Sequence, residues 1–324
     1  MAKRPSTEEA LAAIRAIRDA PEQFDLKRDL APFLTHKSNH AAAAAADTIG
    51  WLEITGMNQE LVDSFGHWMK NPLDRDPGCK ALTAIAKALI GLEHPASEVY
   101  FAGVRHIQEE ASYGPPVDTA AALRGLCAQG LARMSHPDAL SECVKLLVDP
   151  EVAARAGAAR AISESGQYAG VLLLRLKALI GDKAEDVLAE CFAGLLRLAP
   201  KESVEFVAQF LQASPEEVSE RAALALGESR LAAALPFLQE AFEQTAYGSL
   251  RKTLLLSIAM LRQDDGLDFL LAHLAEDSEQ TALDTLEALS IYGRDQGVGA
   301  RVRGILTSRN SPALIDAFRN YFQG

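Results

Sequence analysis

A short segment of this chain recurs at a fixed step of 32 residues, and this step constrains the fold more than any other feature. Residues 158–165 align with residues 222–229 at twice that step. The small residues that keep this phase are Ala161, Ala193, Ala225 and Ser257. A unit of this length cannot bury an apolar face alone and must stack on its neighbours. The sequence therefore predicts a repeat array in which Ala161, Ala193 and Ala225 line close contacts between neighbouring helices.

Each repeat unit is predicted to contain two helices. In the best-defined unit an alanine-rich helix is expected over 215–226, a break over 227–230, and a bulkier helix over 235–242. Pro236 fits the first turn of the second helix, where a missing N–H costs little. Acidic or N-capping residues precede the first helices, namely Asp149, Asp182, Ser214 and Asp277.

A longer step of 42 residues relates the units of the N-terminal half. Residues 84–95 align with residues 126–137, and the same step back leads to the alanines of 41–46. We expect N-terminal capping helices over 1–35, longer repeats over 36–149, and short repeats with a C-terminal cap over 150–324. Together these parts would form one continuous all-α solenoid of about eight stacked helix pairs. Pro115 and Pro116 mark residues 112–117 as a loop between helices.

The composition agrees with a helical array and limits the partners. The 324 residues include 56 Ala and 45 Leu, which favour helices, whereas aromatic residues make up 6%, too few for a large sheet. The net charge of −12 argues against a nucleic-acid partner, because such binding depends on Lys and Arg at phosphates. Residues 200–290 alone carry 6 basic and 16 acidic side chains, a net charge of −10. The acidic excess is therefore concentrated in one part of the chain.

The cysteines and apolar segments favour a cytoplasmic protein. Cys79, Cys127, Cys143 and Cys191 are far apart in the sequence and form no disulfide framework, which indicates a reducing compartment. The first residues contain no apolar core of a signal peptide. The apolar runs are too short and too often interrupted by charges to span a bilayer, so no membrane association is expected.

Two segments carry a resemblance to a known repeat family. Residues 221–229 read Arg-Ala-Ala-Leu-Ala-Leu-Gly-Glu-Ser, and residues 235–238 read Leu-Pro-Phe-Leu. This unit resembles the short HEAT repeat of the phycobilisome-lyase type, and residues 149–182 hold a second copy. The resemblance implies a right-handed, armadillo-like superhelix with first helices on the convex side and second helices on the concave side. Because this repeat class includes scaffolds, enzyme subunits and a few enzymes, the resemblance leaves the activity open.

Second-helix side chains are the candidate binding residues. Five phenylalanines in these helices are expected to fill the core: Phe206, Phe210, Phe237, Phe242 and Phe269. The side chains between them should face outward as an acidic groove suited to a basic peptide or protein: Glu205, Gln209, Glu240, Glu243, Asp268 and His273. In the N-terminal half Trp68, Arg105 and His106 lie on the corresponding helices. An exposed Trp68 or Arg105 would anchor a partner, whereas a buried Trp68 would be part of the core.

No recognisable constellation of catalytic, metal-binding or cofactor-binding residues is present in the sequence. His36 and His40 would share one face of a helix, but no third ligand follows at a typical spacing. His94 and His136 recur before prolines at repeat corners, where a cationic imidazole would cap the preceding helix. We therefore expect no metal and no cofactor.

These observations favour a non-enzymatic scaffold or adaptor that binds a protein or peptide on its concave surface. The alternative is a lyase-like enzyme, or a subunit of one, that handles a hydrophobic ligand such as a tetrapyrrole. Only the resemblance motivates this alternative, and it requires a deep apolar pocket with a Cys, Tyr or His at its wall. The sequence leaves the oligomeric state open.

Overall fold

The structure is a computed structural model, and it describes residues 5–246 and 248–322. The chain divides into two compact units, unit 1 (residues 1–170) and unit 2 (residues 171–324). Unit 1 contains α1 (Thr7–Asp19), α2 (Leu26–Leu34), α3 (Asn39–Trp51), α4 (Asn58–Trp68), α5 (Pro72–Arg75), α6 (Lys80–Gly91), α7 (Ser97–Val104), β1 (Glu109–Glu110), β2 (Val117–Asp118), α8 (Ala121–Arg133), α9 (Ala139–Leu146) and α10 (Val152–Glu164).

Helix α11 (Ala169–Ile180) begins at the end of unit 1 and continues into unit 2. The other helices of unit 2 are α12 (Glu185–Leu198), α13 (Pro200–Ala208), η4 (Gln209–Gln212), α14 (Glu216–Ser229), α15 (Leu235–Gln244), α16 (Ser249–Leu261), α17 (Asp264–Glu276), α18 (Glu279–Ala288), α19 (Gln296–Arg309) and α20 (Pro312–Tyr321). The assignment of residues 1–35, 36–149 and 150–324 to cap, long repeats and short repeats stays a prediction.

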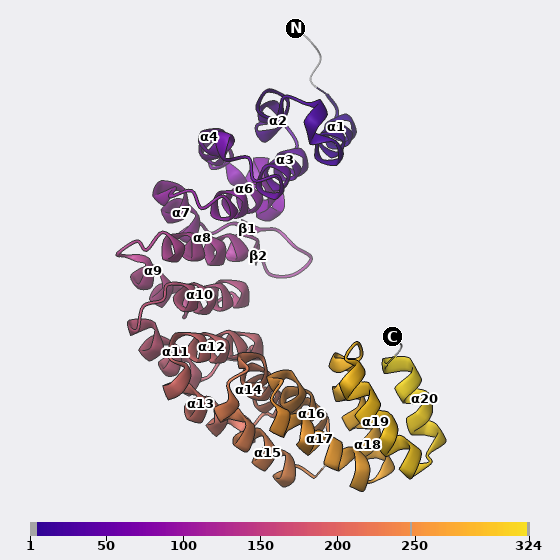
Figure 1. Cartoon of the computed structure of the whole chain (residues 1–324). Helices are drawn as coiled ribbons and strands as arrows, with labels where there is room; N and C mark the ends of the chain where they lie inside the picture. Colours follow the sequence, from indigo (N-terminus) through magenta and orange to yellow (C-terminus); the bar gives the residue numbers. More distant parts are fainter. Residues whose placement is uncertain (1–4, 247, 323–324) are drawn as a thin grey trace. The chain divides into compact units, whose positions relative to one another are not determined.

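The first helices of successive repeats pack side by side in a row. In unit 1 this row is formed by α3, α6, α8 and α10, and in unit 2 by α12, α14, α16 and α18. A second layer lies against each row, made of α4, α7 and α9 in unit 1 and of α13, α15 and α17 in unit 2 (Figure 1). Each unit is therefore a stack of helix pairs, and the predicted all-α solenoid architecture is confirmed.

The two layers of unit 2 lie on opposite sides of a bend. Figure 1 shows α13 and α15 on the outer side of the curve that unit 2 traces, and α12, α14 and α16 on its inner side. The expectation that second helices form the concave side is therefore wrong for unit 2. The reason is the close approach of the first helices, where a Cβ atom added to Gly227 would lie 2.7 Å from the Cα of Ser257. The more closely spaced row of helices lies inside the bend.

The 32-residue period predicts which first helices are in contact, but the residue in phase is not always the one that is buried at the contact. Ala161 and Ala225 are buried as predicted, whereas Ala193 is exposed and the following residue, Gly194, is buried instead. The prediction for Ala193 is wrong because packing rotates α12 by about one residue relative to its neighbours. In unit 1 the closest approach joins two glycines of α8 and α10, Gly125 and Gly157, which are also 32 residues apart.

The predicted helix boundaries hold to within a few residues in the best-defined unit. Helix α14 continues to Ser229 and ends at Arg230, which adopts the left-handed conformation with φ 55°. Helix α15 begins at Leu235, and Pro236 lies in its first turn as predicted. The break thus begins at Arg230, three residues later than the sequence predicts.

Three first helices of unit 1 end in the same backbone motif. Glu53, Glu93 and Ser135 follow α3, α6 and α8 with φ values of 52°, 52° and 55°. One residue later the N–H groups of His94 and His136 donate to carbonyls five residues earlier, at 3.0 Å in both cases. The two histidines therefore cap these helices with their backbone. The imidazole of His136 instead accepts a hydrogen bond from the Asp138 N–H at 3.2 Å, beside the start of α9, so the predicted cationic cap is not formed there.

The segment predicted as a loop, residues 112–117, connects the two strands of a small hairpin, and its last residue begins β2. Strands β1 and β2 pair antiparallel, with Glu109 opposite Asp118 and Glu110 opposite Val117. Between the strands Tyr113 is fully exposed, and the connection projects from the helices of unit 1 (Figure 1). Among the described helices, none combines the length and apolar composition that a membrane span requires.

Candidate partner-binding surfaces

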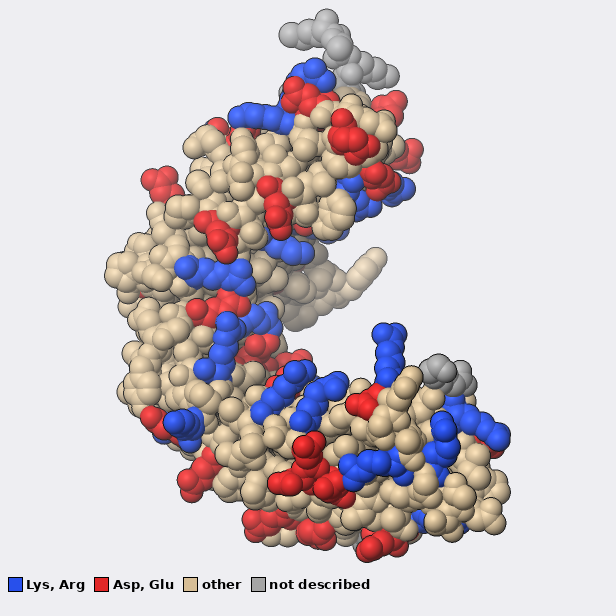
Figure 2. Space-filling view, in the orientation of Figure 1, with Lys and Arg blue, Asp and Glu red and all other residues tan. Residues whose placement is uncertain are grey.

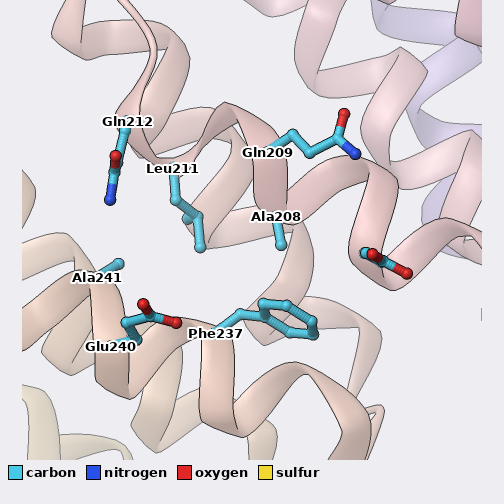
Figure 3. A pocket seen from close by; sticks show the side chains of 8 residues that line it. Ala208, Gln209, Leu211, Gln212, Phe237, Glu240 and Ala241 are labelled. Atoms are coloured by element: carbon cyan, nitrogen blue, oxygen red, sulfur yellow. The ribbon is translucent and has the colours of Figure 1, made fainter.

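Three of the predicted acidic-groove residues line one cavity of unit 2. The cavity has a volume of about 300 Å³, and Glu205 of α13, Gln209 of η4 and Glu240 of α15 contribute to its wall. Leu211 and Phe237 supply its apolar part, and Figure 3 shows the Phe237 ring directed towards the cavity from α15. The structure thus brings these side chains together, because α13 and α15 are neighbouring second helices one repeat apart. We call this cavity the acidic pocket.

Among the residues that the structure describes, no cationic side chain pairs with the two carboxylates of the acidic pocket. The Glu240 carboxylate accepts a hydrogen bond from the Gln244 amide at 3.1 Å, and the Gln212 amide in turn bonds to Gln244. Within the described residues the Glu205 side chain makes neither a hydrogen bond nor an ion pair. Both glutamates are exposed, so their charges are available to a ligand at the mouth of the pocket.

The phenylalanines of the second helices are not all core residues. Phe242 is completely buried, as predicted. Phe206, Phe210, Phe237 and Phe269 are half-buried instead. Phe237 lines the acidic pocket, so this part of the core prediction is wrong and the ring is accessible to a ligand.

The other three predicted groove residues, Glu243, Asp268 and His273, lie on α15 and α17 and do not line the acidic pocket. His273 lies between two carboxylates, with its Nε2 3.3 Å from Glu243 and its Nδ1 2.9 Å from Asp277. Asp268 forms an ion pair with Arg301 of α19 at 2.5 Å. These side chains already have partners, so the six predicted residues do not make one continuous groove.

The predicted aromatic and cationic residues of unit 1 do not form a common surface. Trp68 is buried, and its indole N–H donates to the Leu34 carbonyl at 2.8 Å. Trp68 is therefore a core residue and not an anchor for a partner. Arg105 is exposed and pairs with Glu142 at 2.5 Å. His106 is half-buried and contacts the Gln108 side chain at 3.0 Å. Trp68 therefore offers no surface to a partner.

The other histidines singled out in the sequence are held by local contacts. His36 is buried, with Nε2 2.9 Å from the Pro5 carbonyl and Nδ1 accepting from the Ser38 N–H at 3.1 Å. It precedes α3, whereas His40 lies inside α3, so the two do not share a helix face. Within the described chain no three His, Cys, Asp or Glu side chains are grouped to hold a metal ion.

A buried ion-pair network connects the hairpin to the first helices of unit 1. The guanidinium of Arg124 donates to Asp118 at 2.6 Å, to both carboxylate oxygens of Asp149 at 2.9 Å, and to the His106 carbonyl at 2.9 Å. Asp149 also accepts from the Glu151 N–H at 2.8 Å, just before α10. The sequence identified Asp149 only as a helix start, since nothing in it linked this residue to Arg124.

The carboxylate of Asp118 is held in its charged form. Burial alone would raise its pKa, but hydrogen bonds from the Gln108 and Ala120 N–H groups and from Arg124 outweigh this effect and lower the pKa. Protonation of Asp118 would therefore remove one of the two charged partners of Arg124 and weaken the network. It fixes the base of the hairpin rather than forming an open site.

The largest of the described cavities lies in unit 1, and sequence reasoning missed it. The cavity has a volume of about 1040 Å³ and is lined from α1, α3, α6 and α8. Trp51, the last residue of α3, contributes to its wall and is 68% exposed. We call it the Trp51 groove. The chain has two tryptophans, and the sequence does not distinguish them, because both end a helix.

Helix α11 presents a second unexpected surface. Leu172, Leu176, Leu179 and Ile180 are 58–66% exposed and lie on one face, whereas Val171, Leu174 and Ala178 on the opposite face are buried. An exposed apolar stripe of this kind is typical of interaction sites. Nothing in the described chain shows what covers it.

The lyase-like alternative requires a deep apolar pocket with a Cys, Tyr or His at its wall, and no described residue of these three types lines the acidic pocket or the Trp51 groove. All four cysteines are buried. Burial raises the pKa of Cys79, Cys143 and Cys191 to about 12, and it also raises the pKa of Cys127. None of the four lines the acidic pocket or the Trp51 groove. Thiolate chemistry at these positions is therefore disfavoured at neutral pH.

Comparison with known proteins identifies the repeat type. The family model for HEAT repeats matches residues 172–259, which span α11 to α16. No curated protein matches the chain. Among solved structures, an engineered protein is 16% identical with a TM-score of 0.39, covering 91% of this chain and 87% of its own.

Two natural solved structures are also similar. The complex of CpcE and CpcF of phycocyanin lyase from Nostoc sp. PCC7120 is 14% identical with a TM-score of 0.37, covering 95% of this chain and 97% of its own. Kap121p bound to Ste12p is 13% identical with a TM-score of 0.43, covering 98% of this chain and 45% of its own. The predicted resemblance to HEAT repeats is confirmed by the family model alone, which matches residues 172–259.

Proposed function

We propose that this chain is a non-enzymatic interaction module whose acidic pocket binds a basic segment of a protein partner. The observation that carries the proposal is the pair of exposed carboxylates, Glu205 and Glu240, beside an apolar wall. Neither has a cationic partner in the part of the chain that the structure describes. HEAT-repeat arrays commonly present extended surfaces of this kind to other proteins. The pocket lies on the second layer of unit 2, so the partner would bind on the outer side of the bend rather than in a concave groove.

The chemistry of the pocket suits an amphipathic basic segment. An aliphatic side chain of the partner would enter beside Leu211 and Phe237, where burial of apolar surface supplies most of the affinity. Lysine or arginine next to it would pair with Glu205 and Glu240, and Gln209 would accept or donate a hydrogen bond to the partner backbone. The charges would mainly raise the association rate and select the partner.

The test uses a fluorescent peptide of alternating lysine and leucine and measures its binding to the full chain by anisotropy. We expect the double variant Glu205→Gln and Glu240→Gln to bind at least about tenfold more weakly, because two charge contacts are lost. A matched control, Glu276→Gln with Glu287→Gln, changes the net charge equally at exposed positions outside the pocket. Equal affinities of the two double variants would refute the pocket as the binding site.

A further inference from the structure

We propose that the Trp51 groove of unit 1 binds an acidic peptide segment of a partner protein, with an apolar side chain of that segment packed on Trp51. This site is separate from the acidic pocket, lies in the other unit, and has the opposite charge preference. It therefore adds a second binding specificity to the chain.

The exposed tryptophan is the first observation behind this proposal. Trp51 exposes 68% of its surface beside a cavity of about 1040 Å³, whereas Trp68 is buried and its N–H is satisfied. Leu11, Ile14 and Leu126 extend the apolar wall of the groove. An accessible tryptophan in a concave apolar setting is the type of residue that carries most of the energy in protein interfaces.

The charge of the groove is the second observation. Four basic side chains line it, Arg15, Arg18, Lys87 and Arg133, against two acidic ones, Asp19 and Asp47. Arg133 pairs with Glu164 and Arg18 approaches Asp19 at 3.6 Å. Within the described residues Arg15 and Lys87 have no ion-pair partner, and both are exposed. A locally positive groove in a chain of net charge −12 favours an anionic ligand.

An unpartnered amide in the groove is the third observation. Gln129 of α8 is only 7% exposed, lines the groove, and makes no hydrogen bond within the described chain. The Gln129 amide therefore relies for hydrogen bonding on the small area that it still exposes to water, and covering that area without a new bond would be costly. The backbone of a bound peptide can supply the missing donor and acceptor, which a simple counter-ion cannot do.

These observations together favour an acidic peptide over other anions. A nucleic-acid strand needs an uninterrupted row of cations along its phosphates, and Asp19 and Asp47 interrupt the row here. A small inorganic anion would leave Trp51 and the apolar wall unused. A peptide with one large apolar side chain flanked by carboxylates uses the tryptophan, the free cations and the Gln129 amide at once.

The experiment measures binding of a fluorescent peptide with one central phenylalanine between glutamate runs to the full chain, by anisotropy. We expect Trp51→Ala to weaken binding at least about tenfold and Arg15→Glu with Lys87→Glu to abolish it. Both substitutions change exposed side chains, so thermal unfolding should stay unchanged. As a control, the Glu205→Gln and Glu240→Gln variant should bind this peptide like the unmodified chain.

Iodide quenching of tryptophan fluorescence gives an independent readout, because Trp68 is buried and Trp51 is accessible. Peptide binding should reduce the quenching of the intact chain, and a peptide with lysine in place of glutamate should not. Equal peptide affinity of Trp51→Ala and the unmodified chain would overturn the proposal. So would sedimentation showing that a second copy of the chain, rather than the peptide, shields Trp51.

Discussion

Gly125 and Gly157 face each other across the contact between α8 and α10, so closely that a Cβ atom on Gly157 would overlap the Cα of Gly125. The two glycines are 32 residues apart, which is the period of the repeat. This contact explains why small residues recur with the period of the repeat. Helices of neighbouring repeats can come into backbone contact only where their side chains are smallest.

Replacing Gly157 by alanine should therefore destabilise the chain although alanine is the better helix former. We expect a loss of about 1–3 kcal/mol in the free energy of unfolding, since the added methyl group has no space. The control is Gly66→Ala in the interior of α4, where nothing lies within 4 Å of the new Cβ. That variant should gain about 0.5–1 kcal/mol, as measured by denaturant unfolding. Changes of opposite sign in the free energy of unfolding would support the close contact between Gly125 and Gly157, and changes of the same sign would contradict it.

Glycine should stabilise the chain at a helix end. Glu93 follows α6 with φ 52°, so a Cβ atom is strained there, and its exposed side chain has only an electrostatic interaction with Arg133 to offset the strain. Glu93→Gly is expected to raise the free energy of unfolding by about 1 kcal/mol. Glu98→Gly, at an exposed position inside α7, should lower it by a similar amount. A loss of stability in Glu93→Gly would refute the left-handed conformation.

The Arg124 network predicts a specific acid sensitivity. Because the pKa of Asp118 is lower in the folded than in the unfolded chain, its ionisation contributes stability above the unfolded pKa of about 4. This contribution is lost as the pH falls through the lower folded pKa. Arg124→Met should destabilise the chain by about 3 kcal/mol at pH 7, because Asp118 and Asp149 remain buried without their partner.

The same variant should also lose less stability than the unmodified chain between pH 5 and pH 3, measured by urea unfolding at each pH, the range being set by the unfolded carboxyl pKa of about 4. An acid dependence identical in both chains would show that the network does not control it.

Two leucines of α11 test the exposed apolar stripe. Leu174 is completely buried, whereas Leu176 is 58% exposed on the other face of the same helix. Leu174→Ala should lower the free energy of unfolding by about 2–5 kcal/mol, and Leu176→Ala should change it by less than about 0.5 kcal/mol. Thermal unfolding of both variants provides the comparison. A large loss in Leu176→Ala would mean that this face is covered in solution.

The sequence by itself determined the helical repeat architecture and the positions of many helix ends. The 32-residue step, the small residues in phase and Pro236 located α14 and α15 to within a few residues, because these signals depend on local backbone preferences. It also identified Glu205, Gln209 and Glu240 as outward-facing, since polar side chains between apolar ones must leave the core.

Only the tertiary structure decided how each helix is rotated and what its neighbours cover. Ala193 is exposed although its repeat equivalents are buried, and Phe237 lines a pocket although it resembles a core residue. The two tryptophans are a second example of burial that the sequence does not predict. Both lie at the end of a helix, but only Trp68 is buried by other parts of the fold. A sequence period fixes spacing along the chain, whereas burial depends on contacts between segments that lie far apart in it.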